Sequence, residues 1–215
     1  LESRTAELQL LREMIDLMQS SISADEAYDV VQRYLVRLFP QDTGALYLFP
    51  PALDALEKRV AWGEHTALLT PVFAPEECWA LRRGHVHHVL ASHGDAVCRH
   101  TPAVDRVEGV CVPMLAQGHA LGILHFCRIE RNDATMAEPS FLTLAETVAN
   151  SIGLAIANLQ LRETLRQQSI RDPLTGLFNR RYLDETLRRE ILRATRAGST
   201  LGVIMLDIDH FKRFN

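Results

Sequence analysis

The sequence predicts a protein of the α+β class: an antiparallel sheet flanked by helices, a long connector helix, and then a short α/β segment. Three observations lead to this prediction. Short apolar runs separated by turn residues occupy most of residues 43–129, which is typical of antiparallel strands. An apolar stripe at helical spacing continues through residues 137–169. After residue 170, turn residues, a helical pattern and one short apolar run follow one another.

The composition is that of a folded globular protein. Of 215 residues, 47% are hydrophobic and 23% are charged, which excludes disordered and collagen-like chains. The 23 basic residues are outnumbered by 27 acidic ones, so we expect no nucleic-acid partner, because such surfaces need a basic excess. We find no run of about 18 apolar residues and therefore expect no membrane segment. Four cysteines suit a reducing compartment, and we expect a cytoplasmic location.

Residues 1–22 have the pattern of a coiled-coil-like helix. The helical pattern is already present at Leu1, so we expect the chain to be an internal piece of a longer protein. A heptad seam at alternating steps of three and four predicts packing against a parallel partner or the protein's own sheet. The seam comprises Leu8, Leu11, Ile15, Met18 and Ile22.

A second amphipathic helix is predicted after Asp25, with its apolar stripe ending at Leu38 before Pro40. Strands and one short helix are predicted next, since apolar runs alternate with Gly, Pro and polar residues. The predicted strands are 45–49, 57–62, 86–90, 109–115 and 120–129, and the short helix is 75–83. The last two strands are separated by residues 116–119, a hairpin signal that contains Gly118.

The long helix predicted over residues 137–169 exceeds what a small domain needs, and we expect its far end to act as a connector. The character of the chain changes after residue 170. Turn chemistry at residues 172–176 precedes a helix capped by Asn179 and ended by Gly198. The apolar run 201–206 predicts a buried strand, with Asp207 and Asp209 at its carboxyl end.

Two carboxylates after a buried strand are a pattern typical of Mg²⁺ sites that handle phosphates. A capped strand end with solvated Asp residues is the alternative interpretation. Residues 172–181 (DPLTGLFNRR) and 205–215 (MLDIDHFKRFN), at their mutual separation, resemble the opening of a diguanylate cyclase domain, the GGDEF family. The resemblance covers residues 171–215 and implies a partial ferredoxin-like, palm-like α/β segment.

The resemblance also implies roles for individual residues. The implied ligands of Mg²⁺ are the carboxylate of Asp207 and the backbone carbonyl of Ile208. The implied GTP-binding residues are His210, Phe211, Lys212 and Asn215. Asp172 and Thr175 belong to a turn that the family uses to tether the catalytic domain to its input helix, which implies a structural or regulatory role. In the family, two GTP-loaded subunits together form cyclic di-GMP and two pyrophosphates.

The Gly-Gly-Asp/Glu-Glu-Phe signature itself is absent from the chain, so half of the implied site is missing. We therefore expect residues 1–215 to be inactive alone, and the parent protein to be the enzyme. We also expect the segment after residue 170 to be poorly ordered or to lack packing partners, because about 45 residues bury little core. The main alternative is a parent with a degenerate signature that only binds GTP or cyclic di-GMP.

Residues 23–160 resemble a GAF domain, a sensory module, of the kind found directly ahead of diguanylate cyclase domains. The resemblance is carried by the segments 43–48, 78–84, 111–114 and 122–126. It implies an antiparallel sheet with helices but leaves the GAF ligand unknown, since one fold serves many functions.

Histidines and cysteines gather in the irregular middle of this segment and suggest a soft-metal site. The candidates are Cys78, His87, His88, Cys98 and His100. Their spacing matches no standard zinc pattern, and surface histidines with ordinary buried cysteines are the alternative interpretation. A bilin attached through a cysteine is a further alternative, although the neighbouring residues do not resemble phytochrome motifs.

The sequence thus predicts a helix at 1–22, a GAF sensor at 23–160, a connector end at 161–170 and a GGDEF fragment at 171–215. We expect the sensor to regulate cyclic di-GMP synthesis by the parent protein. We also expect a homodimer, in which the helices at 8–22 and 141–165 form a parallel bundle. A standalone small-molecule-binding GAF protein is another alternative, but it leaves the two matched motifs after residue 170 unexplained.

Overall fold

The structure, a computed structural model, describes residues 2–50, 54–90, 96–104, 107–116, 118–129, 135–207 and 209. The chain divides into two compact units, Leu1–Leu161 and Arg162–Asn215. The α-helices are α1 (Glu2–Ser20), α2 (Ala24–Leu38), α3 (Trp79–Arg83), α4 (Pro139–Ile170) and α5 (Arg180–Ala197). The strands are β1 (Thr43–Leu48), β2 (Leu56–Trp62), β3 (Val72–Phe73), β4 (His87–Leu90), β5 (Val107–Ala116) and β6 (His119–Ile129). Two 3-10 turns, η1 (Thr66–Leu68) and η2 (Pro75–Glu77), lie before α3.

The first unit is built on a six-stranded sheet in the order β3-β2-β1-β6-β5-β4, and every neighbouring pair is antiparallel. Both faces of this sheet are buried, because alternate side chains of each strand point to opposite sides. In β1, Leu46 and Leu48 join the core on one face while Ala45 and Tyr47 join the core on the other. The strand periodicity predicted from sequence is therefore present.

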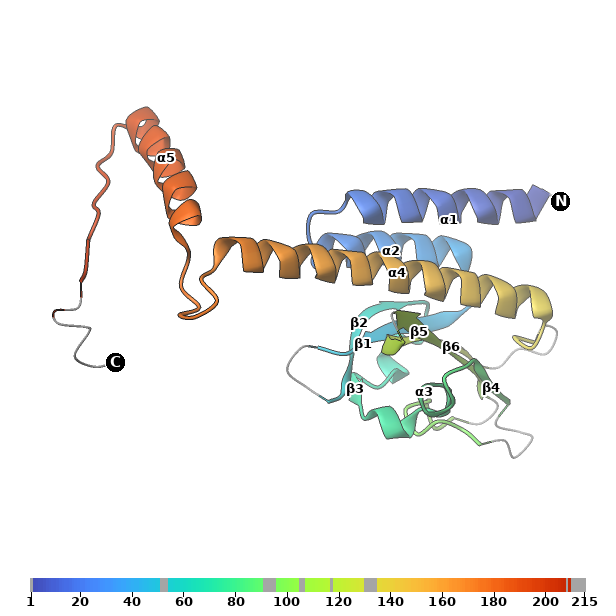
Figure 1. Cartoon of the computed structure of the whole chain (residues 1–215). Helices are drawn as coiled ribbons and strands as arrows, with labels where there is room; N and C mark the ends of the chain where they lie inside the picture. The colour runs from blue at the N-terminus through green and yellow to red at the C-terminus, as the bar shows by residue number, and fades with distance from the viewer. Residues whose placement is uncertain are drawn as a thin grey trace. The chain divides into compact units, whose positions relative to one another are not determined.

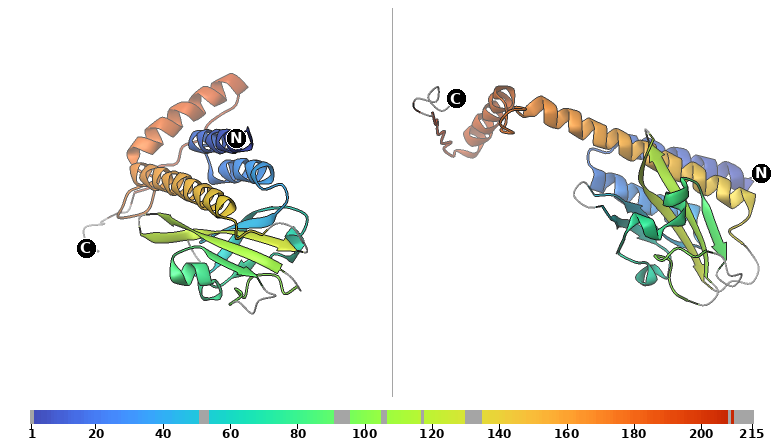
Figure 2. Two further views of the ribbon diagram at one scale, coloured as in Figure 1. Left: turned by 90° about the vertical axis from the view of Figure 1, so that its right-hand side faces the viewer. Right: turned by 60° about the horizontal axis from the view of Figure 1, so that its bottom comes forward.

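Helices α2 and α4 cover one face of the sheet, and α1 lies on the outer side of these helices (Figures 1 and 2). The face of α4 that includes Val148 and Ile152 is fully buried, and it belongs to the same core as Val112 of β5. By length and composition alone, α4 is apolar enough to span a membrane. Its residues between Ala145 and Ile156 include seven that are buried in the core of this unit.

The opposite face of the sheet is covered by α3 and by irregular segments (Figure 1). Tyr47 and Phe73 form an edge-to-face pair in this second core, with ring centroids 4.9 Å apart. All four cysteines are buried here and are free thiols. Within the polar segment 96–104, residues 98 and 100–102 are buried in this interior, whereas residues 96, 97, 99 and 103 are exposed.

The structure corrects the predicted seam of the first helix. Leu11 and Met18 are buried, and Met14 joins them, but Leu8 is 61% exposed. Ile22 is 94% exposed, because it lies beyond the end of α1 at Ser20. The buried face of α1 packs against α2 of the same chain. This packing explains why the buried residues differ from the predicted seam.

The start of α2 also differs from the prediction. The N-cap is Ser23, whose hydroxyl accepts from the Glu26 amide at 3.2 Å. The Glu26 carboxylate in turn accepts from the Ile22 amide at 2.7 Å, an arrangement close to a capping box. These bonds fix the three-residue connection that places α2 against α1.

In the second unit, α5 begins after Asn179 and ends at Gly198, as predicted. The Asn179 side chain accepts from the Tyr182 amide at 3.0 Å, and Gly198 takes the left-handed conformation of a C-cap. The strand predicted at 201–206 is not formed, and its residues are exposed. The described part of this unit holds no other strand, so the run has no neighbour with which to pair.

Candidate functional site

The predicted nucleotide-binding segment follows this exposed apolar run. Asp207 and Asp209 are both exposed. The remaining predicted residues, Ile208, His210, Phe211, Lys212 and Asn215, lie outside the described residues. What the structure contributes here is two accessible carboxylates separated by one residue, an oxygen-donor set of the kind that Mg²⁺ prefers.

The turn after α4 is held by its own side chains. The Asp172 carboxylate accepts from the Leu174 and Thr175 amides at 3.1 and 2.9 Å and from the Thr175 hydroxyl at 2.9 Å. The bond from the Thr175 amide is the largest influence, and together these bonds lower the pKa of Asp172. Asp172 is therefore a carboxylate at neutral pH, and it holds the turn through bonds to Leu174 and Thr175.

Two further contacts join this turn to the helices beside it. The Arg171 guanidinium donates to the Gly176 carbonyl at 2.6 Å and lies over the Phe178 ring. The Asn179 side-chain amide donates to the Ser169 carbonyl at 2.8 Å. The C-terminal end of α4 and the N-terminal end of α5 are thereby linked through a defined reversal of the chain.

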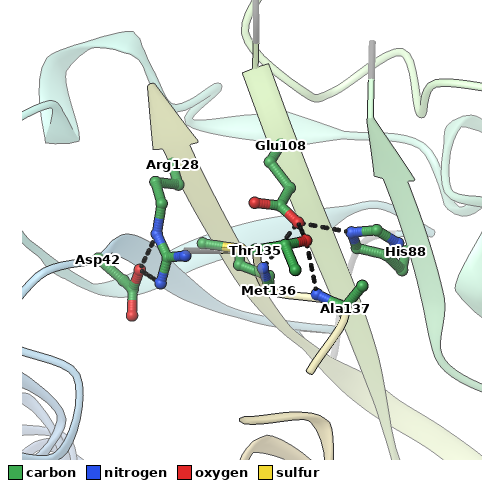
Figure 3. A network of polar contacts seen from close by, with 7 residues as sticks. All are labelled: Asp42, His88, Glu108, Arg128, Thr135, Met136 and Ala137. Atoms are coloured by element: carbon green, nitrogen blue, oxygen red, sulfur yellow. Dashed lines mark hydrogen bonds and ion pairs between the residues drawn. The ribbon is translucent and has the colours of Figure 1, made fainter. Parts of the chain in front are cut away.

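A buried carboxylate joins the sheet to the N-terminal end of α4 (Figure 3). One oxygen of Glu108 accepts from His88 Nε2 at 2.8 Å, from the Met136 amide at 2.7 Å and from the Thr135 hydroxyl at 2.5 Å. Burial opposes ionisation of Glu108, but these bonds outweigh it and lower the pKa of the carboxyl. Because Thr135 and Met136 lie a few residues before Pro139, Glu108 fixes the segment that leads into α4 to β5 and β4.

A second ion pair in Figure 3 supports the same junction. Asp42, just before β1, accepts from Arg128 of β6 at 2.6 Å, and both side chains are almost fully buried. The Arg128 guanidinium also lies 5.9 Å from the centre of the Phe141 ring in α4. Arg128 of the sheet therefore contacts the first turn of α4, while Glu108 binds the residues that come before it.

A sulfur-rich cluster lies in the core on the other face of the sheet. The ligand atoms of Cys78, Cys98, His100 and Cys111 all lie within 4.8 Å of one another, and all four residues are buried. Cys78 precedes α3, Cys98 and His100 lie in the irregular segment, and Cys111 lies in β5. The structure thus brings together three of the five predicted candidates.

The other two candidates are engaged elsewhere. His87 Nε2 lies 2.8 Å from the carbonyl of Ala96, and His88 pairs with Glu108. The fourth member, Cys111, was not among the candidates. It lies in β5 and comes next to the other three only through the fold, so nothing in the local sequence marks it.

Hydrogen bonds couple the protons of the three thiols. The pKa of Cys98 is lowered far below its ordinary range. The largest cause is the hydrogen bond with Cys111, and the next is the hydrogen bond with Cys78. Contacts with Cys78 and Cys98, together with burial, raise the pKa of Cys111. The pKa values of Cys98 and Cys111 thus move in opposite directions, because Cys111 and Cys78 donate hydrogen bonds to the Cys98 sulfur.

His125 stands beside this cluster, with Nδ1 3.3 Å from the Cys111 sulfur. Complete burial lowers the pKa of His125 to about 3, so the ring is neutral at physiological pH. Its other ring nitrogen has no hydrogen-bond partner among the residues that the structure describes. His125 is thus a polar neighbour that sequence inspection did not single out.

Two family models match the chain in series. The model of the GAF domain matches residues 23–156, and the model of the diguanylate cyclase GGDEF domain matches residues 169–215. Both resemblances expected from the sequence are confirmed, in the expected order, and the GAF-like α+β fold is confirmed with them.

Curated relatives of the C-terminal part are diguanylate cyclases. Diguanylate cyclase DgcP of Pseudomonas aeruginosa is 53% identical over 53 residues, which are 25% of this chain and 8% of that protein. Diguanylate cyclase DosC of Escherichia coli is 34% identical over 84 residues, 39% of this chain and 18% of DosC. The chain therefore spans less than a fifth of the length of either relative.

Among solved structures, the GAF domain of an Acinetobacter phosphoenolpyruvate-protein phosphotransferase aligns with a TM-score of 0.58 at 15% identity. The alignment covers 73% of this chain and 95% of that domain. At this identity the likeness concerns the fold alone.

Proposed function

We propose, from the premise that this chain belongs to the GAF domain family, that it is the sensory part of a GAF-regulated diguanylate cyclase. The observation that carries the proposal is the order of the two matches, since a GAF domain at residues 23–156 precedes the opening of a GGDEF domain at residues 169–215. One continuous helix, α4, connects the two matched segments. We place the protein in the cytoplasm, where GTP is available.

The proposed reaction joins two GTP molecules into cyclic di-GMP. The 3′-hydroxyl of each GTP attacks the α-phosphate of the other, each attack releases pyrophosphate, and each hydroxyl proton passes to solvent. In this proposal the amides near His210 and Phe211 and the Lys212 ammonium bind phosphate oxygens. The Asn215 side chain hydrogen-bonds the guanine and so selects the base.

A magnesium ion fits the donor chemistry at the head of this segment. Asp207 and Asp209 offer exposed carboxylates, and carboxylate oxygens are suitable ligands for a hard cation. In the proposal, Asp207 and the Ile208 carbonyl hold the ion. When bound, Mg²⁺ neutralises phosphate charge and so promotes displacement at the α-phosphate.

Regulation is proposed to pass through α4. At its N-terminal end, Glu108 of the sheet binds the residues that precede the helix. At its C-terminal end, the Asp172–Thr175 turn redirects the chain into α5. A rearrangement of β4 and β5 would therefore alter the position of α4, and the preformed turn would convey that change to the catalytic segment.

A homodimer through the N-terminal and connector helices completes the proposal, because two GTP-loaded subunits must meet. Large leucine side chains on these helices support it, since Leu8 and Leu154 are 61% and 62% exposed. An interface would remove this apolar surface from water. Light scattering on the purified chain should give twice the monomer mass, and a monomer at micromolar concentration would contradict the dimer.

The test uses the full-length gene product, including whatever sequence follows Asn215, incubated with GTP and MgCl₂. We expect cyclic di-GMP from the wild-type protein and at least about a hundredfold less from Asp207→Asn, as expected when charge stabilisation is lost. Asp184→Asn is the matched control, because Asp184 is an exposed carboxylate of α5 paired only loosely with Arg180, at 4.0 Å. Its activity should equal that of the wild type.

One outcome would contradict the cyclase, and another would contradict the role of Asp207. Binding of GTP or cyclic di-GMP without turnover would favour the receptor alternative. Equal activity of the wild type and Asp207→Asn would remove Asp207 from the proposed site.

A further inference from the structure

The second core of the GAF unit contains an unusual concentration of polar atoms. Four thiols and two imidazoles lie among apolar side chains, where polar groups need partners to offset their lost hydration. His100 is 1% exposed; its Nε2 lies 3.6 Å from the Cys111 sulfur, and its Nδ1 has no hydrogen-bond partner among the described residues. Thiols form only weak hydrogen bonds, so these contacts alone do little to offset the lost hydration of the His100 ring.

We propose that Cys78, Cys98, His100 and Cys111 form a structural zinc site inside the GAF domain. Zinc is bound by cysteine sulfur and histidine nitrogen, and three cysteines with one histidine are an established donor set for it. The proposal concerns the GAF unit only and is independent of the proposed cyclase activity.

The separations suit a tetrahedral ion. With Zn–S bonds of about 2.3 Å, the ligand atoms of a tetrahedron lie about 3.8 Å apart. The four atoms lie within 4.8 Å of one another, and the pair formed by His100 Nε2 and the Cys111 sulfur is already at 3.6 Å. Side-chain rotations that shorten the longer separations would complete the geometry without moving the sheet.

The backbone holds two of the ligand segments together before any metal arrives. The Arg99 amide donates to the Glu77 carbonyl at 3.1 Å, and the Trp79 amide donates to the Cys98 sulfur at 3.2 Å. The Thr101 amide donates to the Cys98 carbonyl at 3.0 Å, which forms a tight turn over Cys98–Thr101. An amide directed at a sulfur stabilises its thiolate form, the form that binds metal.

The closed character of the cluster distinguishes a structural from a catalytic zinc. All four ligands come from the protein, and each is buried, so no position is open to water or substrate. The ion would fasten α3 and residues 96–104 to β5. Because Glu108 lies in the same strand as Cys111, zinc would also steady the strand that contacts the start of α4.

The test measures zinc in the purified full chain after expression in zinc-supplemented medium and purification under reductant. We expect about one zinc per chain in the wild type. Cys98→Ser and Cys111→Ser should lower the zinc content by about tenfold or more. Cys127→Ser is the matched control, since Cys127 is equally buried in the same core but outside the cluster, and it should keep its zinc.

A second measurement guards against variants that fail to fold. The apo wild-type chain, titrated with Co²⁺, should develop thiolate charge-transfer bands and the visible bands of a tetrahedral ion, and Zn²⁺ should abolish them. His100→Cys should retain binding and change the Co²⁺ spectrum, because it supplies a fourth thiolate.

Three results would overturn the site. In the first, the reduced wild-type chain binds neither Zn²⁺ nor Co²⁺. In the second, Cys98→Ser and Cys111→Ser keep their zinc. In the third, the purified chain contains a Cys78–Cys98 disulfide and still binds no metal after that disulfide is reduced. Each concerns zinc alone, whereas loss of cyclic di-GMP synthesis would concern only the proposed function.

Discussion

Replacing Glu108 removes the acceptor at the centre of the junction in Figure 3. Glu108→Ala leaves the amide of Met136, a residue with no exposed surface, without its partner. A buried unsatisfied donor costs about 1–3 kcal/mol, and a hydrogen bond to a charged group is worth about 1.5–3 kcal/mol. The His88 side chain is 27% exposed, so water can replace Glu108 as its partner in the variant. The lost His88 bond therefore adds little to the loss of stability. We therefore expect Glu108→Ala to lower the free energy of unfolding by about 3 kcal/mol.

Glu108→Gln should lower the free energy of unfolding by only about 1–2 kcal/mol, because an amide oxygen still accepts from the Met136 amide but carries no charge. The assay is urea unfolding of the full chain followed by tryptophan fluorescence. The matched control is Glu57→Gln in β2, whose carboxylate pairs with Arg59 at 2.7 Å on a partly exposed surface. Such a pair contributes about 1 kcal/mol or less.

The pH dependence follows from the lowered pKa of Glu108. A carboxyl whose folded pKa lies below its unfolded value of 4.5 stabilises the fold above that value. This stability is lost as the pH falls through the folded pKa. The difference between wild type and Glu108→Gln should thus be full at neutral pH and narrow below about pH 4.5. Glu108→Ala within about 0.5 kcal/mol of wild type at pH 7 would refute the role of the network.

Three further predictions concern other sites. Gly122→Ala should lower the free energy of unfolding by about 2 kcal/mol or more, because the new Cβ would collide with the Tyr47 carbonyl. The control is Gly202→Ala, whose Cβ would meet open space and which should leave stability unchanged in the same assay. Asn179→Ala should cost α5 about 1 kcal/mol by removing its cap, detectable as weaker helical NMR shifts in the first turn. Asp172→Ala should speed hydrogen exchange of the two turn amides that its carboxylate binds, and unchanged exchange would contradict its place in the turn.

Much of the fold could be predicted because its signals are local. The alternation in β5 that placed Val110, Val112 and Met114 on one face, and the Asn179 cap, depend on near neighbours in sequence, and the structure contains both. The register of the first helix could not be predicted so directly. Several apolar stripes fit its sequence, and packing against α2 determines which one is buried.

The candidate sites divide in the same way. Cys98 and His100 are close in sequence and were recognisable together, but Cys111 joins them only through the folding of the irregular segment onto β5. The role of Glu108 could not be predicted from the local sequence, because its partners are 20 to 28 residues away in the chain. The run 201–206 was predicted as a buried strand from its composition, but burial requires neighbouring strands, and the described part of the second unit supplies none.

The most direct test of the central proposal is product analysis of the full-length protein. Purified protein is incubated with GTP and MgCl₂, and the nucleotides are identified by chromatography and mass spectrometry. We expect cyclic di-GMP and pyrophosphate to appear together as GTP is consumed. GTP that remains intact, or that is converted only to GDP or GMP, would contradict a GAF-regulated diguanylate cyclase.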